Sequence, residues 1–468
     1  MRNAVLLLLA LAPIWAGCSV LSRQTAGTQE LLPSAAAPLD AGAHRHIKHV
    51  VVIVQENRSF ESFFAGYPGA NAPTHGCGVP AASPPLRHGE APATSECPSG
   101  DRLIELHQVT FEKEPNLSHE FEAALIDWHN GKMDGFTHWG KYGPHHDTEA
   151  YAYIERSQVA PYWQIARQYV LADNMFPTEY GPSWTAHLTL VAGTDSLSDK
   201  LALADFADAR SNCHAPGGSK TTTVDSQRVI RHANGPYPCL DQFNTIAQVL
   251  DTAGVSWKYY VARKLKAFIW SPFAAIKYVY DGPDWDNNIV VPQTQILKDV
   301  ADGRLASVSW VTPSKQDSDH PGAHSDTGPS WVTSVVNAVG QSKYWDSTAI
   351  VVLWDDWGGF YDNAPPPQLD FRGLGIRVPC LIISPYAKEG VVVHTQYEFG
   401  SILRFVRDVF QLPPLGPASA GYTDSRANSL SDSFDFNKPP RSFQPITSKY
   451  PARHFLNEPR SSEPVDTE

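Results

Sequence analysis

The pattern of apolar and polar residues changes abruptly at the end of an early strand. Residues 49–54, HVVVIV, are mostly Val and Ile, which is typical of a strand covered by helices on both faces. Polar residues follow without a spacer at 55–59, and aromatic residues then return at helical spacing from Phe60. Ligands of open α/β sheets lie beyond the carboxyl ends of the strands. The junction therefore predicts a site at Glu56 and Asn57, unless both residues only cap the next helix.

A second junction of this kind lies late in the chain. The apolar run 348–354, TAIVVLW, leads directly into Asp355 and Asp356. A buried carboxylate is costly unless it is paired. The two acids therefore either meet a positive group or lie exposed in the glycine turn that follows them.

Apolar strands and amphipathic helices alternate along most of the chain. Strands are predicted at 306–313 and 378–385, and helices at 161–170, 329–341 and 398–410. Another helix is predicted to begin at Ser183, in the turn Gly181-Pro182-Ser183, where the serine could act as N-cap, as phosphate ligand, or as both. Strands that alternate with helices predict an α/β sandwich.

The first residues are typical of an export signal. Residues 1–18 have one positive charge, an apolar core and small residues before a cysteine, and they are too short to span a membrane. The ending Ala-Gly-Cys is similar to a lipoprotein signal, although Trp15 departs from it. Cys18 would then carry the lipid and anchor the chain to a membrane. We expect an exported protein, either a periplasmic or membrane-anchored lipoprotein or a secreted one.

Composition gives the plan of the remaining chain. We expect a flexible tether at 19–45, one main domain at 46–415 with insertions near 65–102, 196–240 and 262–302, and a polar C-terminal tail at 416–468. The net charge of −12 at pH 7 argues against nucleic acid as a partner. The sequence makes no prediction about the oligomeric state.

Export changes the interpretation of the cysteines, because disulfides persist in oxidising compartments. Cys77 with Cys97, and Cys213 with Cys239, each close a loop rich in Pro, Gly and Ser, so both pairs are plausible disulfides. Cys380 lies in a strand-like run, where a buried free thiol is expected.

Several short motifs, taken together, resemble the bacterial phosphoesterase family. They are ENRSF at 56–60, GPS at 181–183, SDHP at 318–321 and WDDWGGFYD at 354–362, and they occur in the family's order. The resemblance covers about residues 46–412. The family includes phosphatidylcholine-type phospholipases C and an acid phosphatase branch.

This resemblance implies an alkaline-phosphatase-like three-layer sandwich, with a mostly parallel sheet between helices. It also implies one divalent metal ion bound by Glu56, Asn57, Ser183, Asp355 and Asp356. Ser183 would be the nucleophile, and His119 and His320 would lie around the phosphoryl group. His187, Asp134 and His394 are weaker candidates for substrate contact. An all-oxygen ligand set suits calcium, magnesium or manganese better than zinc.

The sequence departs from the family pattern near these motifs. Residues 185–187 are Thr-Ala-His where many members have Pro-Asn-Arg, and Asn363 and Phe399 each replace a frequent histidine. We therefore expect a phosphoric ester hydrolase with a phosphoseryl intermediate that acts on phosphomonoesters, as an acid phosphatase does. A phospholipase C that releases phosphorylated headgroups from phospholipids is the alternative. From another class, the alternative is a non-catalytic surface lipoprotein that binds metal.

Overall fold

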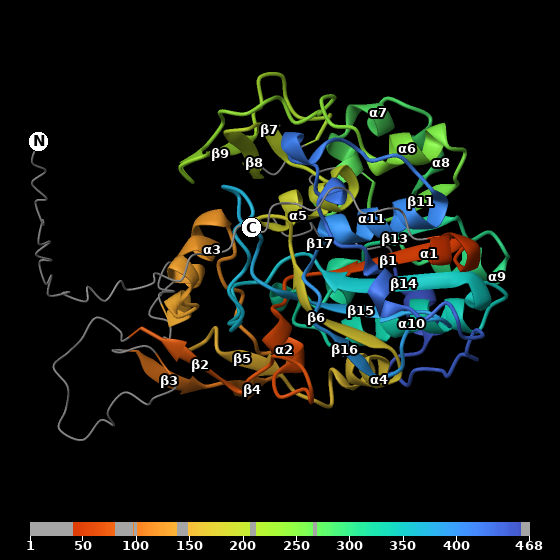
Figure 1. Cartoon of the computed structure of the whole chain (residues 1–468), viewed down its shortest axis with the longest axis horizontal. Coiled ribbons are helices and arrows are strands. Elements are labelled where there is room, and N and C mark those ends of the chain that lie inside the picture. The colour runs from red at the N-terminus through yellow and green to blue at the C-terminus, as the bar shows by residue number, and fades with distance from the viewer. Residues whose placement is uncertain are drawn as a thin grey trace, which may run out of the picture. The chain divides into compact units, whose positions relative to one another are not determined.

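A computed structural model of the chain describes residues 41–79, 97, 101–137, 148–205, 212–264 and 269–459 (Figure 1). The predicted signal at 1–18, the lipidation site Cys18 and most of the predicted tether lie outside the described residues. None of the helices within the described ranges is long and apolar enough to cross a membrane.

A mixed sheet of nine strands forms the middle layer of the described domain. Its order is β12-β11-β13-β1-β14-β15-β6-β16, and β17 also pairs with β6. The strands are β1 (His49–Gln55), β6 (Val170–Phe176), β11 (Trp257–Tyr260), β12 (Ile289–Val290), β13 (Val308–Val311), β14 (Thr348–Trp354), β15 (Val378–Ile383), β16 (Val391–Val393) and β17 (Tyr397–Glu398). Among these described strands, only β15 runs against the others, since its pairings with β14 and β6 are antiparallel. The predicted α/β class with a mostly parallel sheet is confirmed.

Helices cover both faces of this sheet (Figure 1). One face carries α1 (Ala41–His46), α5 (Ser183–Ala192), α6 (Ile246–Thr252) and α11 (Phe399–Phe410), which contact one another in series, and the other carries α4 (Ala160–Gln168), α9 (Gln295–Ala301) and α10 (Gly328–Gly340). The smaller helices are α2 (Phe60–Phe64), α3 (Phe121–Trp128), α7 (Lys277–Tyr280), α8 (Asp284–Asn287) and α12 (Ala452–Asn457). The central strands β1 and β14 are buried on both sides, which explains their runs of Val and Ile.

Strand register sets the geometry of the site. β1 and β14 are parallel neighbours, and Gln55 lies opposite Trp354 at the end of the pairing. The next residues along each strand, Glu56 and Asp355, therefore leave the sheet side by side. Both apolar-to-acidic junctions found in the sequence thus meet at one edge of the sheet.

The segments expected to be insertions contain small sheets of their own. Within 196–240, β7 (Ser196–Ser198), β8 (Leu201–Asp205), β9 (Thr222–Asp225) and β10 (Ile230–Arg231) form a four-stranded antiparallel sheet. From the 65–102 segment, β2 (His75–Gly78) pairs with β3 (Arg102–Glu105), which begins at its end. A further pair, β4 (His107–Val109) with β5 (Ala152–Ile154), lies outside the expected insertions. The segment 262–302 instead extends the main fold, because it supplies the edge strand β12 and the helix α9.

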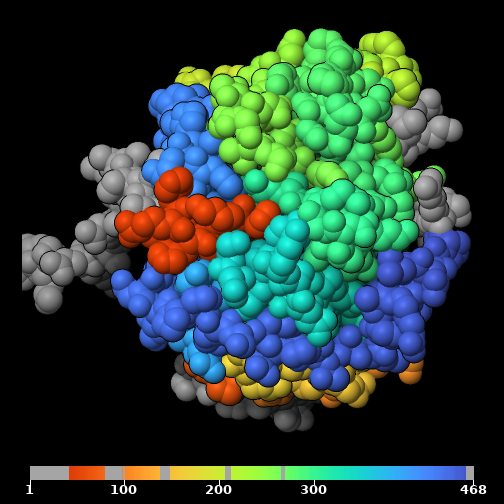
Figure 2. Space-filling model, turned by 90° about the vertical axis from the view of Figure 1, so that its right-hand side faces the viewer, coloured from red at the N-terminus to blue at the C-terminus, as the bar shows by residue number. Residues whose placement is uncertain are grey.

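The packed domain reaches beyond the limits expected from composition. Ala43 is fully buried in α1, within the segment expected to be a tether. At the other end, Phe434, Ile446 and Phe455 are buried in the main core. Figure 2 shows the C-terminal segment, in blue, lying along the surface of the domain. Each of these polar segments is anchored to the core by a few apolar residues. Because those residues are far apart in sequence, they form no periodic pattern that predicts their burial.

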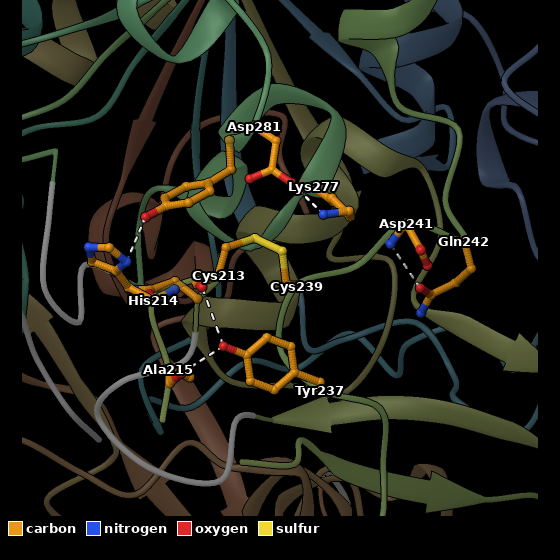
Figure 3. Close-up of a disulfide and its surroundings, with 11 residues drawn as sticks. Cys213, His214, Ala215, Tyr237, Cys239, Asp241, Gln242, Lys277 and Asp281 are labelled. Atoms are coloured by element: carbon orange, nitrogen blue, oxygen red, sulfur yellow. Dashed lines mark hydrogen bonds and ion pairs between the residues drawn. A yellow bond between two sulfur atoms is a disulfide. The ribbon is translucent and has the colours of Figure 1, made fainter. Parts of the chain in front are cut away.

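Both predicted disulfides are present. Cys77 pairs with Cys97, and Cys213 pairs with Cys239, while Cys380 is a buried free thiol. The second bridge joins two loop segments next to α7 (Figure 3). There, Tyr237 donates a hydrogen bond from its hydroxyl to the Ala215 carbonyl at 2.6 Å.

Candidate active site

The polar residues that follow β1 and β14 separate into two adjoining groups. The first contains Glu56 and Asp355, and the second contains Asn57 and Asp356. The backbone N–H of Asn57 donates to Asp355 Oδ1 at 2.9 Å, and this hydrogen bond joins the two groups. All four residues are fully buried.

His187 completes the first group. Its Nε2 lies 2.9 Å from Glu56 Oε1 and 3.7 Å from Asp355 Oδ2. Ligand atoms of these three residues lie within 4.8 Å of one another, which is close enough to hold one metal ion. The histidine expected to contact phosphate therefore contacts two of the expected metal ligands.

Ser183 belongs to the second group. Its hydroxyl donates to Asp356 Oδ2 at 3.2 Å and accepts from Asn57 Nδ2 at 3.2 Å. Asn57 Nδ2 also lies 2.9 Å from His119 Nε2. The structure thus brings the predicted nucleophile, two predicted metal ligands and one predicted catalytic histidine into direct contact.

The first turn of α5 places Ser183 and His187 on the same side of that helix, because residues four apart share a helix face. Gly181 is needed just before it, since a Cβ there would lie 2.5 Å from Thr185 Oγ1 and 3.0 Å from Glu179 Oε1. Burial and the nearby Asp195 raise the pKa of Glu179 well above its ordinary value. The buried Glu179 carboxyl therefore lies beneath the turn that presents the serine, in an environment that favours its neutral form.

The glycine turn after Asp356 is shaped by close backbone packing. Gly358 has φ +64°, and a Cβ on it would lie 2.3 Å from the Asn57 carbonyl oxygen. Its backbone N–H donates to Asp356 Oδ1 at 2.8 Å. The turn thus orients the Asp356 carboxylate and supports the backbone of Asn57.

His320 lies next to His119. The ring centroids of the two histidines are 6.3 Å apart, and both side chains are buried. Asp319 holds this loop, because its carboxylate accepts from the Tyr162 hydroxyl at 2.6 Å and from Trp354 Nε1 at 3.2 Å. Burial raises the pKa of Asp319 to about 6.

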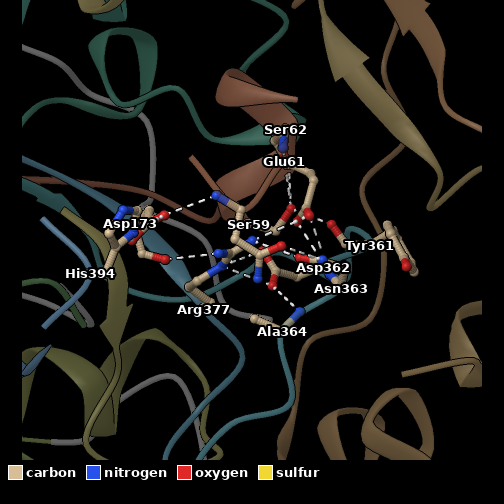
Figure 4. A network of polar contacts seen from close by, with 11 residues as sticks. Ser59, Glu61, Ser62, Asp173, Tyr361, Asp362, Asn363, Ala364, Arg377 and His394 are labelled. Carbon is tan, nitrogen blue, oxygen red and sulfur yellow. Dashed lines mark hydrogen bonds and ion pairs between the residues drawn. The ribbon is translucent and has the colours of Figure 1, made fainter. Parts of the chain in front are cut away.

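The two remaining predicted contacts, Asp134 and His394, have other partners in the described part of the chain. Asp134 Oδ1 lies 2.5 Å from His129 Nδ1. His394 Nδ1 lies 2.9 Å from both carboxylate oxygens of Asp173, at the edge of a separate polar network (Figure 4). Neither residue has a described contact with the groups around Ser183.

Arg58 is a supporting residue that the sequence interpretation missed, although it lies within the ENRSF motif. It is fully buried and donates from Nη1 to Glu114 Oε2 at 2.6 Å and from Nε to the Asp319 carbonyl at 2.8 Å. The available signal for a structural role was the positive charge of Arg58 directly after a strand predicted to be buried. Its partners could not be found from local spacing, since Glu114 and Asp319 are distant in sequence.

The donor groups fit a divalent cation. The carboxylates of Glu56, Asp355 and Asp356 are fully buried close together, which is costly unless positive charge offsets them. Asp355 Oδ2 and Asn57 Oδ1 are buried oxygens that accept no hydrogen bond within the described chain. With His187 beside them, the donors are oxygen and nitrogen. The preference for calcium, magnesium or manganese rested on oxygen alone, and a nitrogen donor also admits zinc or iron.

Comparison with known proteins agrees with the motifs. The model of the Phosphoesterase family matches residues 47–413. Phospholipase C A of Mycobacterium tuberculosis is 26% identical, and the match covers 86% of this chain and 80% of the relative. Non-hemolytic phospholipase C of Pseudomonas aeruginosa is 25% identical, and the match covers 89% of this chain but only 62% of the relative.

Solved structures were also compared. A protein in the alkaline phosphatase superfamily from Vibrio parahaemolyticus is 11% identical, with 83% of this chain and 72% of that chain covered, at a TM-score of 0.37. The assignment of the fold class rests on the sheet topology described above.

Proposed function

Because the chain belongs to the Phosphoesterase family, we propose that it is a metal-dependent phospholipase C that uses Ser183 as its nucleophile. The observation that carries this proposal is the buried group of Ser183, Asn57 and Asp356. This group lies next to the possible metal ligands Glu56, His187 and Asp355. The relatives named phospholipase C favour a phospholipid over the phosphomonoester preferred from the sequence. We therefore propose the phospholipase C alternative in place of the acid phosphatase expected from the sequence.

The reaction would proceed in two steps. Ser183 Oγ attacks phosphorus while its proton moves towards Asp356, to which it already donates a hydrogen bond. The bond from phosphorus to the lipid glycerol oxygen breaks, and that oxygen takes a proton from an imidazole, for which His119 and His320 are the candidates. Water then attacks the phosphoserine and gives one proton back to the imidazole, while Ser183 Oγ regains its proton from Asp356 and the phosphorylated headgroup is released.

The residues that would hold the metal are Glu56, Asp355 and His187, with Asn57, Asp356 and Ser183 adjoining them. A bound divalent cation supplies Lewis-acid stabilisation of the negative charge that develops on the phosphoryl oxygens. The register of two neighbouring strands places these donors side by side. Glu56 and Asn57 follow β1, and Asp355 and Asp356 follow β14.

We also propose that the chain is exported. The two disulfides support this proposal, because such bonds persist outside the reducing cytoplasm. Lipidation at Cys18 would keep the enzyme at a membrane, next to its substrate.

The test measures release of phosphorylcholine from phosphatidylcholine vesicles, together with hydrolysis of para-nitrophenyl phosphorylcholine and para-nitrophenyl phosphate. We expect the two choline esters to be hydrolysed faster than the monoester. A chelator should abolish turnover, and adding back single divalent cations should identify the metal. Ser183→Ala should lose at least about 1,000-fold in kcat and keep its bound metal.

Thr189→Val is a matched control on the same helix. Its hydroxyl donates only to the backbone of Ala186 at 3.0 Å in the described structure, so this variant should stay active. Faster hydrolysis of para-nitrophenyl phosphate than of either choline ester would restore the acid phosphatase assignment. A folded, metal-loaded protein that hydrolyses none of the three substrates would favour the non-catalytic alternative.

A further inference from the structure

Three exposed apolar side chains belong to segments that are distant in sequence. Ile126 in α3 is 45% exposed, Val229 between β9 and β10 is 42% exposed, and Leu369 between β14 and β15 is 44% exposed. Single exposed apolar residues are common on soluble proteins, whereas a group of them marks a surface that contacts another molecule. Whether these three form a group depends on how their segments meet.

Arg228 joins the three segments. Its guanidinium carbon lies 5.0 Å from the centroid of the Trp128 ring in α3. Its Nε donates to the Phe371 carbonyl at 2.8 Å, and its Nη2 donates to Gln368 Oε1. Figure 1 shows α3 and β9 on the same side of the domain. We call the surface formed here the apolar rim, and it consists of Ile126, Val229 and Leu369 around Arg228.

The positive charge of Arg228 is not neutralised by any acid in the described part of the chain. Asp225, in the same turn, instead forms an ion pair with Arg231 at 3.0 Å. Arg228 is partly exposed, and its Nη1 donates to no described residue. A guanidinium group binds phosphate oxygens well. The apolar rim thus combines apolar side chains with a cation that is available to a phosphate.

The apolar rim adjoins the candidate active site through two contacts. Asp127 of α3 accepts from Trp357 Nε1 at 2.9 Å, in the glycine turn that follows the second acidic junction. Tyr180 precedes Ser183 by three residues, and its ring centroid lies 5.6 Å from the guanidinium carbon of Arg228. A partner bound at the apolar rim is therefore held next to the turn that presents the proposed nucleophile.

We propose that the apolar rim docks on the surface of a phospholipid bilayer. Its apolar side chains insert among the headgroups, and Arg228 binds a lipid phosphate. This inference rests on the proposed function, since it names the surface that brings the enzyme to its lipid substrate. Insertion of apolar area supplies binding free energy. The net charge of −12 opposes attraction to an anionic bilayer, so the rim fits a zwitterionic lipid such as phosphatidylcholine.

Flotation with phosphatidylcholine vesicles measures docking without turnover. The protein begins at residue 19, so it has neither the predicted signal nor the lipidation site, and it carries Ser183→Ala to keep the vesicles intact. The rim variant is Ile126→Ser/Val229→Ser/Leu369→Ser. We expect it to partition onto vesicles at least about 10-fold more weakly, because it loses most of the inserted apolar area.

A single substitution tests the phosphate contact, and a matched variant tests the location. Arg228→Gln should partition about 5-fold more weakly, as expected for the loss of one hydrogen bond. Partitioning equal to that of the parent would overturn the phosphate contact. Val391→Ser/Leu456→Ser is the control, since these residues are 36% and 39% exposed on β16 and α12. The control should bind like the parent, and an equal loss there would overturn the assignment to the rim.

Turnover by protein that retains Ser183 gives a second readout. We expect the rim variant to lose at least about 10-fold more kcat/KM on phosphatidylcholine vesicles than on soluble para-nitrophenyl phosphorylcholine. An equal loss on both substrates would overturn the proposal, because it would place the effect in the active site and not in docking.

Failure of this inference and failure of the proposed function give different results. Unchanged flotation of the rim variant overturns the docking surface even if the enzyme hydrolyses phosphatidylcholine. Flotation that depends on the rim, together with no turnover of any substrate, refutes the phospholipase C and supports the docking surface. A wild-type dimer that becomes monomeric in the rim variant, measured by sedimentation, also overturns the proposal, because a second copy would then cover the rim.

Discussion

Removal of the Arg377 side chain should destabilise the protein strongly. Arg377 is fully buried immediately before β15, where it donates from Nε to Asp362 at 3.0 Å and from Nη1 to the Asp173 carbonyl at 2.8 Å (Figure 4). Its Nη2 donates to Glu61 at 3.2 Å and to Asn363 at 3.0 Å. The side chain thus ties the end of the loop that begins at β14 to α2 and β6.

The charges in this network allow the cost to be estimated. Burial and the neighbouring Asp362 raise the pKa of Glu61 well above its ordinary value, which favours its neutral form. The cation of Arg377 is then balanced by the Asp362 carboxylate. Arg377→Met leaves that carboxylate buried without its partner, which costs about 3 to 5 kcal/mol.

A double variant isolates the electrostatic part. In Arg377→Met/Asp362→Asn, no buried charge is left unpaired, and only the hydrogen bonds to neutral groups are missing. These three bonds are worth about 1 kcal/mol each, so we expect the double variant to lie about 3 kcal/mol below the wild type. It should still lie above the single variant, which loses the same bonds and also leaves a charge unpaired.

Urea unfolding followed by tryptophan fluorescence measures these differences. Arg231→Met is the control, since Arg231 makes its ion pair to Asp225 on the surface and should matter little. The reasoning is refuted if Arg377→Met stays within about 1 kcal/mol of the wild type, a small fraction of the expected loss. It is also refuted if the double variant is no more stable than the single one.

Three further predictions concern the turn, the pH response and a disulfide. Gly358→Ala should lower kcat/KM by about 100-fold by displacing Asn57, a result checked by steady-state kinetics; near-normal activity would contradict it. The raised pKa of Asp319, about 6, means that its protonated form stabilises the fold at low pH. That contribution is complete below about pH 4 and is lost as the pH rises through 6, by roughly 3 kcal/mol. Asp319→Asn should flatten this part of the stability curve measured by urea unfolding, and an unchanged slope would count against the assignment. Cys213→Ser/Cys239→Ser opens a loop with a sequence separation of 26, so unfolding without reductant should show a loss of about 3 kcal/mol; an unchanged midpoint would exclude that contribution.

Local pattern was enough to predict the framework of the site. The Val and Ile run at 49–54 predicted a buried strand, and the observed β1 is His49–Gln55. The switch to polar residues after β1 and after β14 located Glu56 and Asp355 at strand ends. The disulfide partners also followed from sequence, because each pair closes a short loop.

The interpretation from local pattern was incomplete where distant segments meet. The 262–302 segment supplies a strand of the main sheet, although β12 is only two residues long and has no recognisable period. Ala43 and Phe455 join the core from segments whose composition is polar. Such short or isolated contributions carry too little pattern to be recognised.

The sequence by itself determined which residue types stand at the ends of the strands and in what order they occur. Only the tertiary structure decided how they pair. His187 lies against Glu56 because α5 packs beside the ends of β1 and β14, and Arg377 meets Glu61 across 316 positions of the chain. The hydrogen bond from the Gly322 N–H to His320 Nδ1 likewise depends on the fold of a single turn. Periodicity reports which face of an element is buried, whereas partners and protonation states depend on strand register and on the packing of distant segments.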